Sequence, residues 1–357
     1  MPTTAPAQKE GRIVFTCGSA EHSVRDVIDA AHFRGEVASH WQEFLRRAAA
    51  EQHANDSGTE PDSSAIDEAA VAFRYEYDLI TAEETEAWLD ARSVSLAEFG
   101  DYLTREYWGK SAARSEPPRI RFDEASAEQR ETFVADLTFS GELDRMAARL
   151  AWRVAAREGA EAAAIDAERA LFLKRHELGA TDVSDWLNAI GRDEVWLREM
   201  LELEAAYETR RARLLTADAI KREITALRLP LTRLEVETLE LESHDAANEA
   251  LMCVRDDGMS MEEVANEGRY PYRRAEMVLE QVPVELQQKF LSVTGGTVLD
   301  PVPRDDGFVL SRLIAKHEPT AADPQVRARI EERILNRHFA DLTAGRIKWS
   351  LPPNTSA

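Results

Sequence analysis

Apolar positions in the first 212 residues occur twice in the same order. A β-branched run from Ile13 to Phe15 has a counterpart at 120–122, and each run precedes a Ser-Ala-Glu triplet. The other matched positions are Phe33 and Phe139, Phe73 and Phe172, Leu79 and Leu178, Trp88 and Trp186, and Leu89 and Leu187. The offset falls gradually from 107 to 98 residues, with the largest change at an extra polar loop, 55–62. This order predicts a tandem duplication.

Each copy is predicted to be a short strand followed by helices. The run IVFTC at 13–17 is typical of a strand, and the matching run at 120–122 is expected to form one as well. Thr81 with Glu84 and Ser95 with Glu98 are capping boxes, which predict two helices joined tightly. We therefore expect a flexible N-terminus (1–11), a first helical repeat (12–108), and a second repeat with a long connecting helix from about Thr216 (119–227). Pro117 and Pro118 mark the linker between the repeats.

The spacing of apolar residues changes in the last third of the chain. Alternation near 234–241 predicts a strand, three helix-sized segments follow, and two strands are expected at 298–299 and 308–314, giving the order β-α-α-α-β-β over 228–320. Asp323 and Pro324 begin a C-terminal amphipathic helix within 321–350, and a flexible tail is expected at 351–357. The predicted fold class is mostly α, with duplicated helical modules followed by a small α+β domain and a C-terminal helix.

Charge and composition limit the classes of partner that this chain is expected to bind. The chain has 66 acidic and 44 basic side chains, a formal charge of −22, which disfavours nucleic acid and an anionic membrane surface. No run of 18 apolar residues and no apolar leader segment is present, so neither a membrane span nor a secretory signal is expected. Cys17 and Cys253 alone make no disulfide framework or metal site. The expected location is the cytoplasm.

The segment 232–316 resembles the parvulin (PpiC-type) domain of peptidyl-prolyl isomerases. The resemblance rests on the strand RLEVETLEL, the helix DAANEALMCV, the segment DDGMSMEEVANEG, and the closing run VTGGTVLDPVPRDDGFVLSRLIAK. The flanking helical segments resemble those of SurA-like and NifM-like chaperones, in which an N-terminal helical module is completed by a C-terminal helix. Here that helix would be followed by Ile347 to Trp349. The resemblance implies a chaperone that contains a parvulin-like domain.

The catalytic residues implied by that resemblance are replaced. The family's histidine in the first strand falls at Thr238 and its histidine in the last strand at Val309, while a glycine-rich segment is replaced by EGRYPY at 267–272. Rotation about a peptide bond has a barrier of ~18–20 kcal/mol, and Thr and Val cannot rebuild the polar network that lowers it. We therefore predict no catalytic residues, and treat Thr238, Val309, Tyr270 and Tyr272 as candidates for peptide binding.

Four tryptophans complete the candidate peptide-binding set: Trp41, Trp88, Trp186 and Trp196. They lie on apolar helix faces, where they form either the core of the repeats or an aromatic groove for a peptide. The eight histidines are scattered without the short fixed spacing of a zinc site, and no phosphate-binding loop or Gly-x-Ser-x-Gly nucleophile motif is present. We expect no metal and no cofactor.

Three functional hypotheses remain. The first is a non-catalytic chaperone or maturation factor that binds one client, either a metalloenzyme or a ribosomally synthesised modified peptide, with or without a modifying enzyme in the same complex. Its groove would be apolar with an acidic rim and would favour segments that carry Lys or Arg. The second is an active or altered prolyl isomerase or a peptide-modifying enzyme. The third is a structural subunit of a larger complex.

Overall fold

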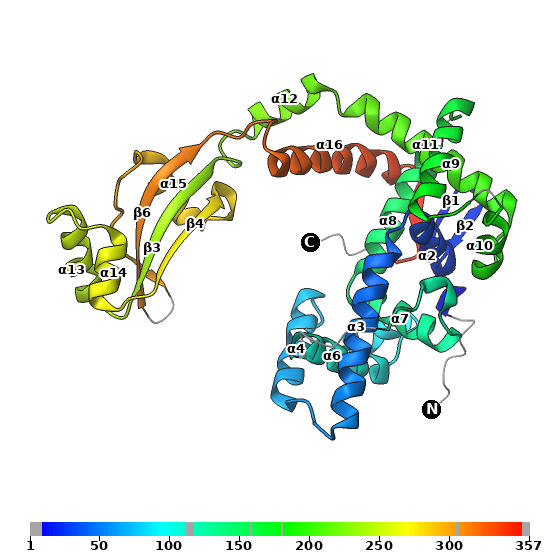
Figure 1. Cartoon of the computed structure of the whole chain (residues 1–357), viewed down its shortest axis with the longest axis horizontal. Coiled ribbons are helices and arrows are strands. Elements are labelled where there is room, and N and C mark those ends of the chain that lie inside the picture. The colour runs from blue at the N-terminus through cyan, green and yellow to red at the C-terminus, as the bar shows by residue number, and fades with distance from the viewer. Residues whose placement is uncertain (1–8, 112–117, 158, 180, 305–306, 352–357) are drawn as a thin grey trace. The chain divides into compact units, whose positions relative to one another are not determined.

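The computed structural model describes residues 9–111, 118–157, 159–179, 181–304 and 307–351. The chain divides into two compact units (Figure 1): unit 1 consists of Met1–Ala212 and His338–Ala357, and unit 2 of Arg213–Arg337. Helices dominate unit 1 and a four-stranded sheet with helices forms unit 2. The predicted fold class is confirmed. The expected flexible ends and the linker at 109–119 lie largely outside the described residues.

Unit 1 contains the two copies. The first copy comprises β1 (Ile13–Cys17), β2 (Ala20–Ser23), α2 (Val24–Phe33), α3 (Val37–Asp56), α4 (Ser63–Glu76), α5 (Ala82–Ala91) and α6 (Leu96–Ser111). The second copy comprises η1 (Phe122–Glu124), α7 (Ala127–Phe139), α8 (Glu142–Ala155), α9 (Ala162–Arg175), α10 (Val183–Ile190) and α11 (Glu194–Leu214). Helices α2 to α6 therefore correspond in order to α7 to α11.

The start of the second copy differs from the prediction. The run at 120–122 was expected to be a strand, but Phe122 begins the 3₁₀ turn η1. In the first copy β1 lies between β2 and β7 (Ile347–Trp349), and both neighbours satisfy its backbone. The described part of the second copy has no such neighbours, so the same apolar run forms a turn. The two Ser-Ala-Glu triplets are consequently not equivalent: 19–21 enters β2, whereas 126–128 begins α7.

Local capping signals are reproduced by the structure. The Thr81 hydroxyl accepts a hydrogen bond from the Glu84 backbone N–H (3.1 Å), and the Glu84 carboxylate accepts one from the Thr81 N–H (2.8 Å). The Ser95 and Glu98 box is also present. The duplication extends to backbone conformation, because Asp78 after α4 and Glu177 after α9 both have a φ of 54°.

A helix begins at Thr216, as the sequence predicted. Helix α11 ends at Leu214, and the Thr216 hydroxyl then caps a separate helix, α12 (Ala217–Ala226), by accepting from the Ala219 N–H. Helix α12 ends before Pro230, as expected, and its 10 residues make it shorter than a long connecting helix. The capping hydroxyl provides the reason, since a residue that caps α12 has an extended backbone (φ −71°, ψ 154°) and cannot continue α11.

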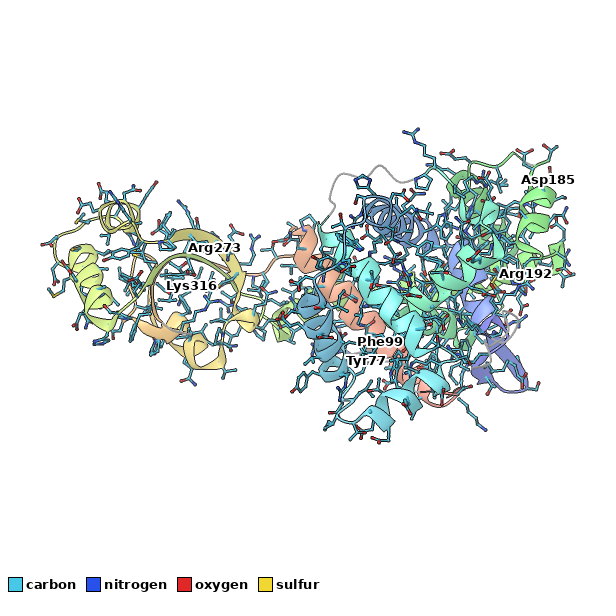
Figure 2. All side chains as sticks on the ribbon, turned by 90° about the horizontal axis from the view of Figure 1, so that it is seen from below. Tyr77, Phe99, Asp185, Arg192, Arg273 and Lys316 are labelled. Carbon is cyan, nitrogen blue, oxygen red and sulfur yellow. The ribbon has the colours of Figure 1, made fainter. Side chains whose placement is uncertain are left out.

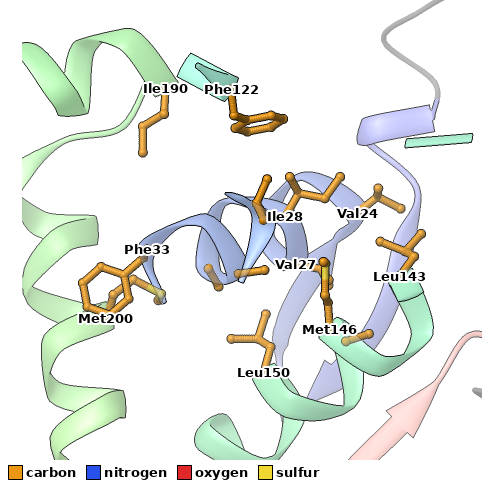
Figure 3. Packing of buried hydrophobic residues seen from close by; sticks show 14 of the residues in the cluster. Val24, Val27, Ile28, Phe33, Phe122, Leu143, Met146, Leu150, Ile190 and Met200 are labelled. Carbon is orange, nitrogen blue, oxygen red and sulfur yellow. The ribbon is translucent and has the colours of Figure 1, made fainter. Parts of the chain in front are cut away.

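The two copies interlock through equivalent phenylalanines. Phe33, at the end of α2, stacks on Phe172 of the second copy with ring centroids 5.2 Å apart. Phe139, its equivalent at the end of α7, lies among aromatic residues of the first copy, including Phe73 and Trp88. Each of these two residues therefore completes the core of the other copy. Figure 3 shows the neighbouring packing of α2 against residues of α8.

Hydrogen bonds from side chains to backbone carbonyls repeat the same exchange between the copies. The Tyr77 hydroxyl donates to the Phe139 carbonyl oxygen at 3.3 Å. At the equivalent position in the second copy, His176 Nε2 lies 3.0 Å from the Phe33 carbonyl oxygen. A carbonyl only accepts, so this nitrogen carries the proton. Aromatic packing and polar bonds thus join the two copies within unit 1.

Unit 2 contains one more strand than expected. Its elements are α12, β3 (Arg233–Leu241), α13 (His244–Arg255), α14 (Met261–Gly268), β4 (Tyr272–Val278), η2 (Leu279–Gln281), α15 (Val284–Ser292), β5 (Val302–Arg304), β6 (Gly307–His317) and α16 (Pro324–Ala344). The antiparallel sheet has the order β4-β3-β6-β5. The predicted order lacked β4, because this edge strand pairs among the described residues with β3 alone and carries the exposed Arg273 and Arg274 in place of an apolar alternation. The short edge strand β5 was not predicted either. The strand expected at 298–299 is a single bridge at Val298.

The face of β3 that carries the buried apolar side chains changes midway along the strand. Leu234 and Val236 pack on one face with residues of α15, whereas Leu239 and Leu241 pack on the opposite face with α13 and α14. Because alternate residues point to opposite faces, each face is covered over only part of its length. The uncovered part of the α15 face contains Thr238 and Glu240.

The C-terminal helix agrees with its prediction. Asp323 accepts a hydrogen bond from the Gln325 N–H at 2.9 Å and caps α16. Within unit 2, Val326, Ile330 and Ile334 pack with Ile220 and Leu231. The last residues of the helix belong to unit 1, where Phe339 stacks on Trp152 with centroids 5.1 Å apart. This amphipathic stripe is the one that the sequence predicted.

Candidate functional site

Trp41 lies in the core of unit 1. Its side chain is 1% exposed, and its indole N–H donates to the Ile120 carbonyl oxygen at 2.8 Å. Its ring contacts those of Phe44, Phe122 and Phe133. All its bonding capacity is used inside the fold, which favours the core interpretation over the groove interpretation for this residue.

The repeat tryptophans are separated into two clusters. Trp88 packs with Phe73, Tyr77 and Phe139. Trp186 packs with His32, Phe172, His176 and Trp196, and Trp196 is itself only partly buried. The structure does not gather the four tryptophans on one surface. A direct role for them in peptide binding stays a prediction.

His32 makes the Trp186 cluster sensitive to acid. Burial lowers the pKa of His32 to about 4, with a smaller contribution from His176, and its Nε2 has no hydrogen-bond partner among the described residues. In an unfolded chain a histidine titrates near ~6.5. The unfolded state therefore binds the proton first, and the stability contributed by neutral His32 is complete above about pH 6.5 and lost as the pH falls towards 4.

We expect acidification from pH 7 to pH 4.5 to cost this site on the order of 2 kcal/mol. The replacement His32→Phe keeps a ring against Trp186 and removes the titration. Urea denaturation at pH 7 and at pH 4.5 gives the free energy of unfolding at each pH. In His32→Phe, the loss of stability between these two pH values should be smaller than in the unaltered protein by about 2 kcal/mol. An unchanged difference would show that His32 titrates alike in the folded and unfolded chain.

Thr238 and Val309 share one face of the unit 2 sheet. Thr238 in β3 lies opposite Ser311 in β6, and Val309 lies opposite Glu240, two residues further along β3. The Thr238 hydroxyl donates to the Arg273 carbonyl oxygen at 3.4 Å. The structure thus brings these two predicted residues onto the uncovered half-face, where neither side chain titrates near neutral pH.

Tyr270 and Tyr272 lie on the other face. Tyr272 is opposite Leu239 in the register, and both tyrosines pack against the cluster formed with α13 and α14. The Tyr272 hydroxyl donates to the Glu237 carboxylate at 2.8 Å. Partial burial, followed by that carboxylate, raises the pKa of Tyr272 to about 12. The phenol therefore remains protonated and structural, and the four candidates of this domain do not form one site.

A cavity at the end of the sheet is lined by one of these four candidates, Val309. This sheet-end cavity has a volume of about 430 Å³ and is lined by Glu240, Leu241, Glu242, Pro271, Arg304, Gly307, Phe308 and Val309. The volume falls within the usual range for ligand pockets. Apolar walls from Phe308 and Val309 stand beside the exposed carboxylates of Glu240 and Glu242. Chemically, this arrangement suits a segment with an apolar side chain next to a cation.

The sequence prediction missed most of the cavity. Glu240 and Glu242 continue the alternation of polar and apolar residues at the end of β3, and this pattern is visible in the sequence. Pro271 and Arg304 gave no such signal, because they reach the cavity only through the pairing of β3 with β4 and of β5 with β6. Among the described residues, no group of three or more His, Cys, Asp or Glu could hold a metal ion. The described helices include none that is long and apolar enough to cross a membrane.

Comparison with known proteins gives similarities among solved structures. No family model matches the chain, and no curated protein matches it. The peptidylprolyl isomerase PrsA of Bacillus cereus is 15% identical, covering 59% of this chain and 85% of that one, with a TM-score of 0.35. The foldase PrsA of Lactococcus lactis is 12% identical, covering 93% and 89%, with a TM-score of 0.26. A SurA-like chaperone of Campylobacter jejuni is 9% identical, covering 59% and 87%, with a TM-score of 0.19.

Proposed function

We propose that this chain is a chaperone-type protein that binds an extended client segment at the sheet-end cavity without catalysing a reaction on it. One observation carries the proposal: at the end of the sheet the cavity joins apolar side chains, among them Phe308 and Val309, to the exposed carboxylates of Glu240 and Glu242. Thr238 and Val309 stand where the resemblance to parvulins places catalytic histidines, and neither side chain provides acid–base chemistry at neutral pH. The preferred segment therefore alternates apolar and basic residues.

The test is peptide binding by the full-length protein. We expect a fluorescein-labelled hexapeptide of alternating Val and Lys to bind at least about tenfold more tightly than its Val and Glu counterpart. The double replacement E240Q/E242Q should weaken binding of the Val and Lys peptide by about tenfold. Val309→Lys, which adds a cation to the cavity, should weaken it further. Fluorescence anisotropy measures each affinity.

A matched control removes the same charge elsewhere in unit 2. Glu249 and Glu267 are exposed residues of α13 and α14 outside the cavity. The variant E249Q/E267Q should bind as the unaltered protein does. If both double variants weakened binding equally, the change in affinity would come from the net charge of the protein and would contradict the proposed site. Prolyl isomerisation above the uncatalysed rate, lost in V309K, would establish the isomerase alternative.

The identity of the client is the finer part of this proposal. We propose as the client either a metalloenzyme or a ribosomally made precursor peptide, bound in the cytoplasm with or without a modifying enzyme in the same complex. Co-purification of the full-length chain with each class of client, repeated with E240Q/E242Q, separates these cases. Recovery of neither class would end this part of the proposal.

A further inference from the structure

Strand β4 forms one edge of the unit 2 sheet (Figure 1), and no strand among the described residues pairs with its outer side. The strand at the opposite edge, β5, has only 3 residues, whereas β4 has 7 and pairs with β3 without a bulge. Arg273 lies on β4 and is exposed (Figure 2). A long edge strand without a bulge is the kind that can pair with a strand from another chain.

The register with β3 fixes which backbone groups of β4 face outward. The Pro271 carbonyl oxygen accepts from the Glu240 N–H at 3.1 Å, and the Leu279 N–H donates to the Thr232 carbonyl oxygen at 2.9 Å. In an antiparallel pair, residues that exchange hydrogen bonds with the neighbouring strand alternate with residues that do not. The odd-numbered residues of 271–279 therefore bond towards β3. The backbone N–H and C=O groups that face outward include those of Tyr272, Arg274 and Glu276.

Side chains of opposite charge stand two residues apart along this edge. The side chains of Arg274 and Glu276 are 57% and 54% exposed. Within unit 2, Arg274 Nε donates to the Glu235 carboxylate at 3.0 Å, and Glu276 Oε2 lies 3.4 Å from Arg233 Nη1. Because more than half of each side chain is exposed, each can contact a further group of opposite charge.

The edge is complementary to itself in one antiparallel register. When Ala275 stands opposite the partner's Ala275, Arg274 stands opposite the partner's Glu276, and Glu276 stands opposite the partner's Arg274. These residues also have outward backbone groups, so that each such pair can exchange two hydrogen bonds. Tyr272 then stands opposite the partner's Val278, a pair of aromatic and β-branched side chains that stabilises sheets. Registers centred on Arg274 or on Glu276 place like charges opposite each other, which is destabilising.

We propose that two copies of this chain pair through β4, in the antiparallel register centred on Ala275, so that their two sheets become one continuous sheet. The alternating charges of Arg274 and Glu276 select this register, and the outward backbone groups supply its hydrogen bonds. The net charge of −22 on each chain opposes association. Contacts within the interface are shorter than the screening length of about 8 Å at about 0.15 M salt, whereas the long-range repulsion is screened. The interface does not rest on the client site proposed above.

Analytical ultracentrifugation of the full-length protein at about 0.15 M salt tests this interface. The weight-average mass should rise with protein concentration from that of one chain towards that of two. R274E places acidic residues opposite each other, and E276R places basic residues opposite each other. Each variant alone should therefore dimerise at least about tenfold more weakly. A mixture of the two variants has opposite charges at both positions and should dimerise about as tightly as the unaltered protein.

Two further variants separate the edge from other surfaces. R274P removes an N–H that faces outward and leaves the hydrogen bonds to β3 in place, so it should prevent dimerisation without changing the circular dichroism spectrum. E267R makes the same charge change as E276R at an exposed residue of α14, and should dimerise as the unaltered protein does.

Three results would overturn the proposal. The first is a mass of one chain at every concentration up to about 1 mM. The second is a dimer that R274E and E276R leave unchanged, and the third is a mixture of these two variants that does not associate. If the unaltered protein remained a single chain and R274P weakened binding of the Val and Lys peptide, the edge would bind a client segment instead of a second copy.

Discussion

Replacing Glu204 by glutamine is expected to lower the free energy of unfolding by about 3–5 kcal/mol. Glu204 in α11 and Arg153 in α8 are 7% and 8% exposed, and two hydrogen bonds join the guanidinium to the carboxylate, one of them 2.7 Å long. The same guanidinium lies 4.0 Å from the centre of the Tyr207 ring. The glutamine leaves a buried positive charge without its counter-ion. Urea denaturation monitored by circular dichroism measures the change.

The duplication supplies a matched control for this pair. Arg47 and Glu106 join α3 to α6 in the first copy as Arg153 and Glu204 join α8 to α11 in the second. Their side chains are 23% and 20% exposed, and Arg47 also donates to Glu43 at 2.9 Å. Water and Glu43 can therefore compensate for a lost partner, and Glu106→Gln should cost at most about 1 kcal/mol. Equal costs for the two variants would contradict the role of burial.

Replacing Phe33 by alanine is expected to cost about 3–5 kcal/mol and to loosen the second copy more than the first. Phe33 belongs to α2, but its ring stacks on Phe172 and it is almost completely buried. Amide hydrogen exchange under native conditions should therefore rise most in α9 and α10, because local opening follows lost packing. Mass spectrometry of peptic fragments resolves these helices.

Replacing Phe139, the equivalent of Phe33, should loosen the first copy more than the second. Phe139→Ala removes a ring that packs with Phe73, Trp88, Phe99 and Tyr102 of the first copy. Exchange should then rise most in α4 to α6, at a similar cost of about 3–5 kcal/mol. If each variant loosened only its own copy, the interlocked arrangement of the two cores would be wrong. Phe33→Leu, which keeps most of the apolar volume, is expected to cost less than about 1.5 kcal/mol.

Local sequence signals predicted much of the helical architecture. The boxes at Thr81 and Ser95 and the cap at Asp323 act within one helical turn, so neighbouring residues alone decide them. The matched order of apolar positions revealed the duplication, because each copy needs the same buried face. The α+β character of the last third followed from its change of period. The parvulin resemblance also placed Thr238 and Val309, and the structure puts these two residues on one face.

Contacts between distant segments decided the rest. The run at 120–122 forms no strand, since only its counterpart in the first copy has β2 and β7 as partners, and β4 is stabilised by β3 rather than by its own apolar pattern. The sheet-end cavity could not be predicted, because Pro271 and Val309 become neighbours only when the chain folds. From its own residues the sequence determined helices, caps and a repeated buried face, because these depend on interactions a few residues apart. Tertiary structure alone decided which copy fills which core and where carboxylates meet a cavity, because those outcomes depend on residues that lie far apart in the chain, as Phe33 and Phe172 do.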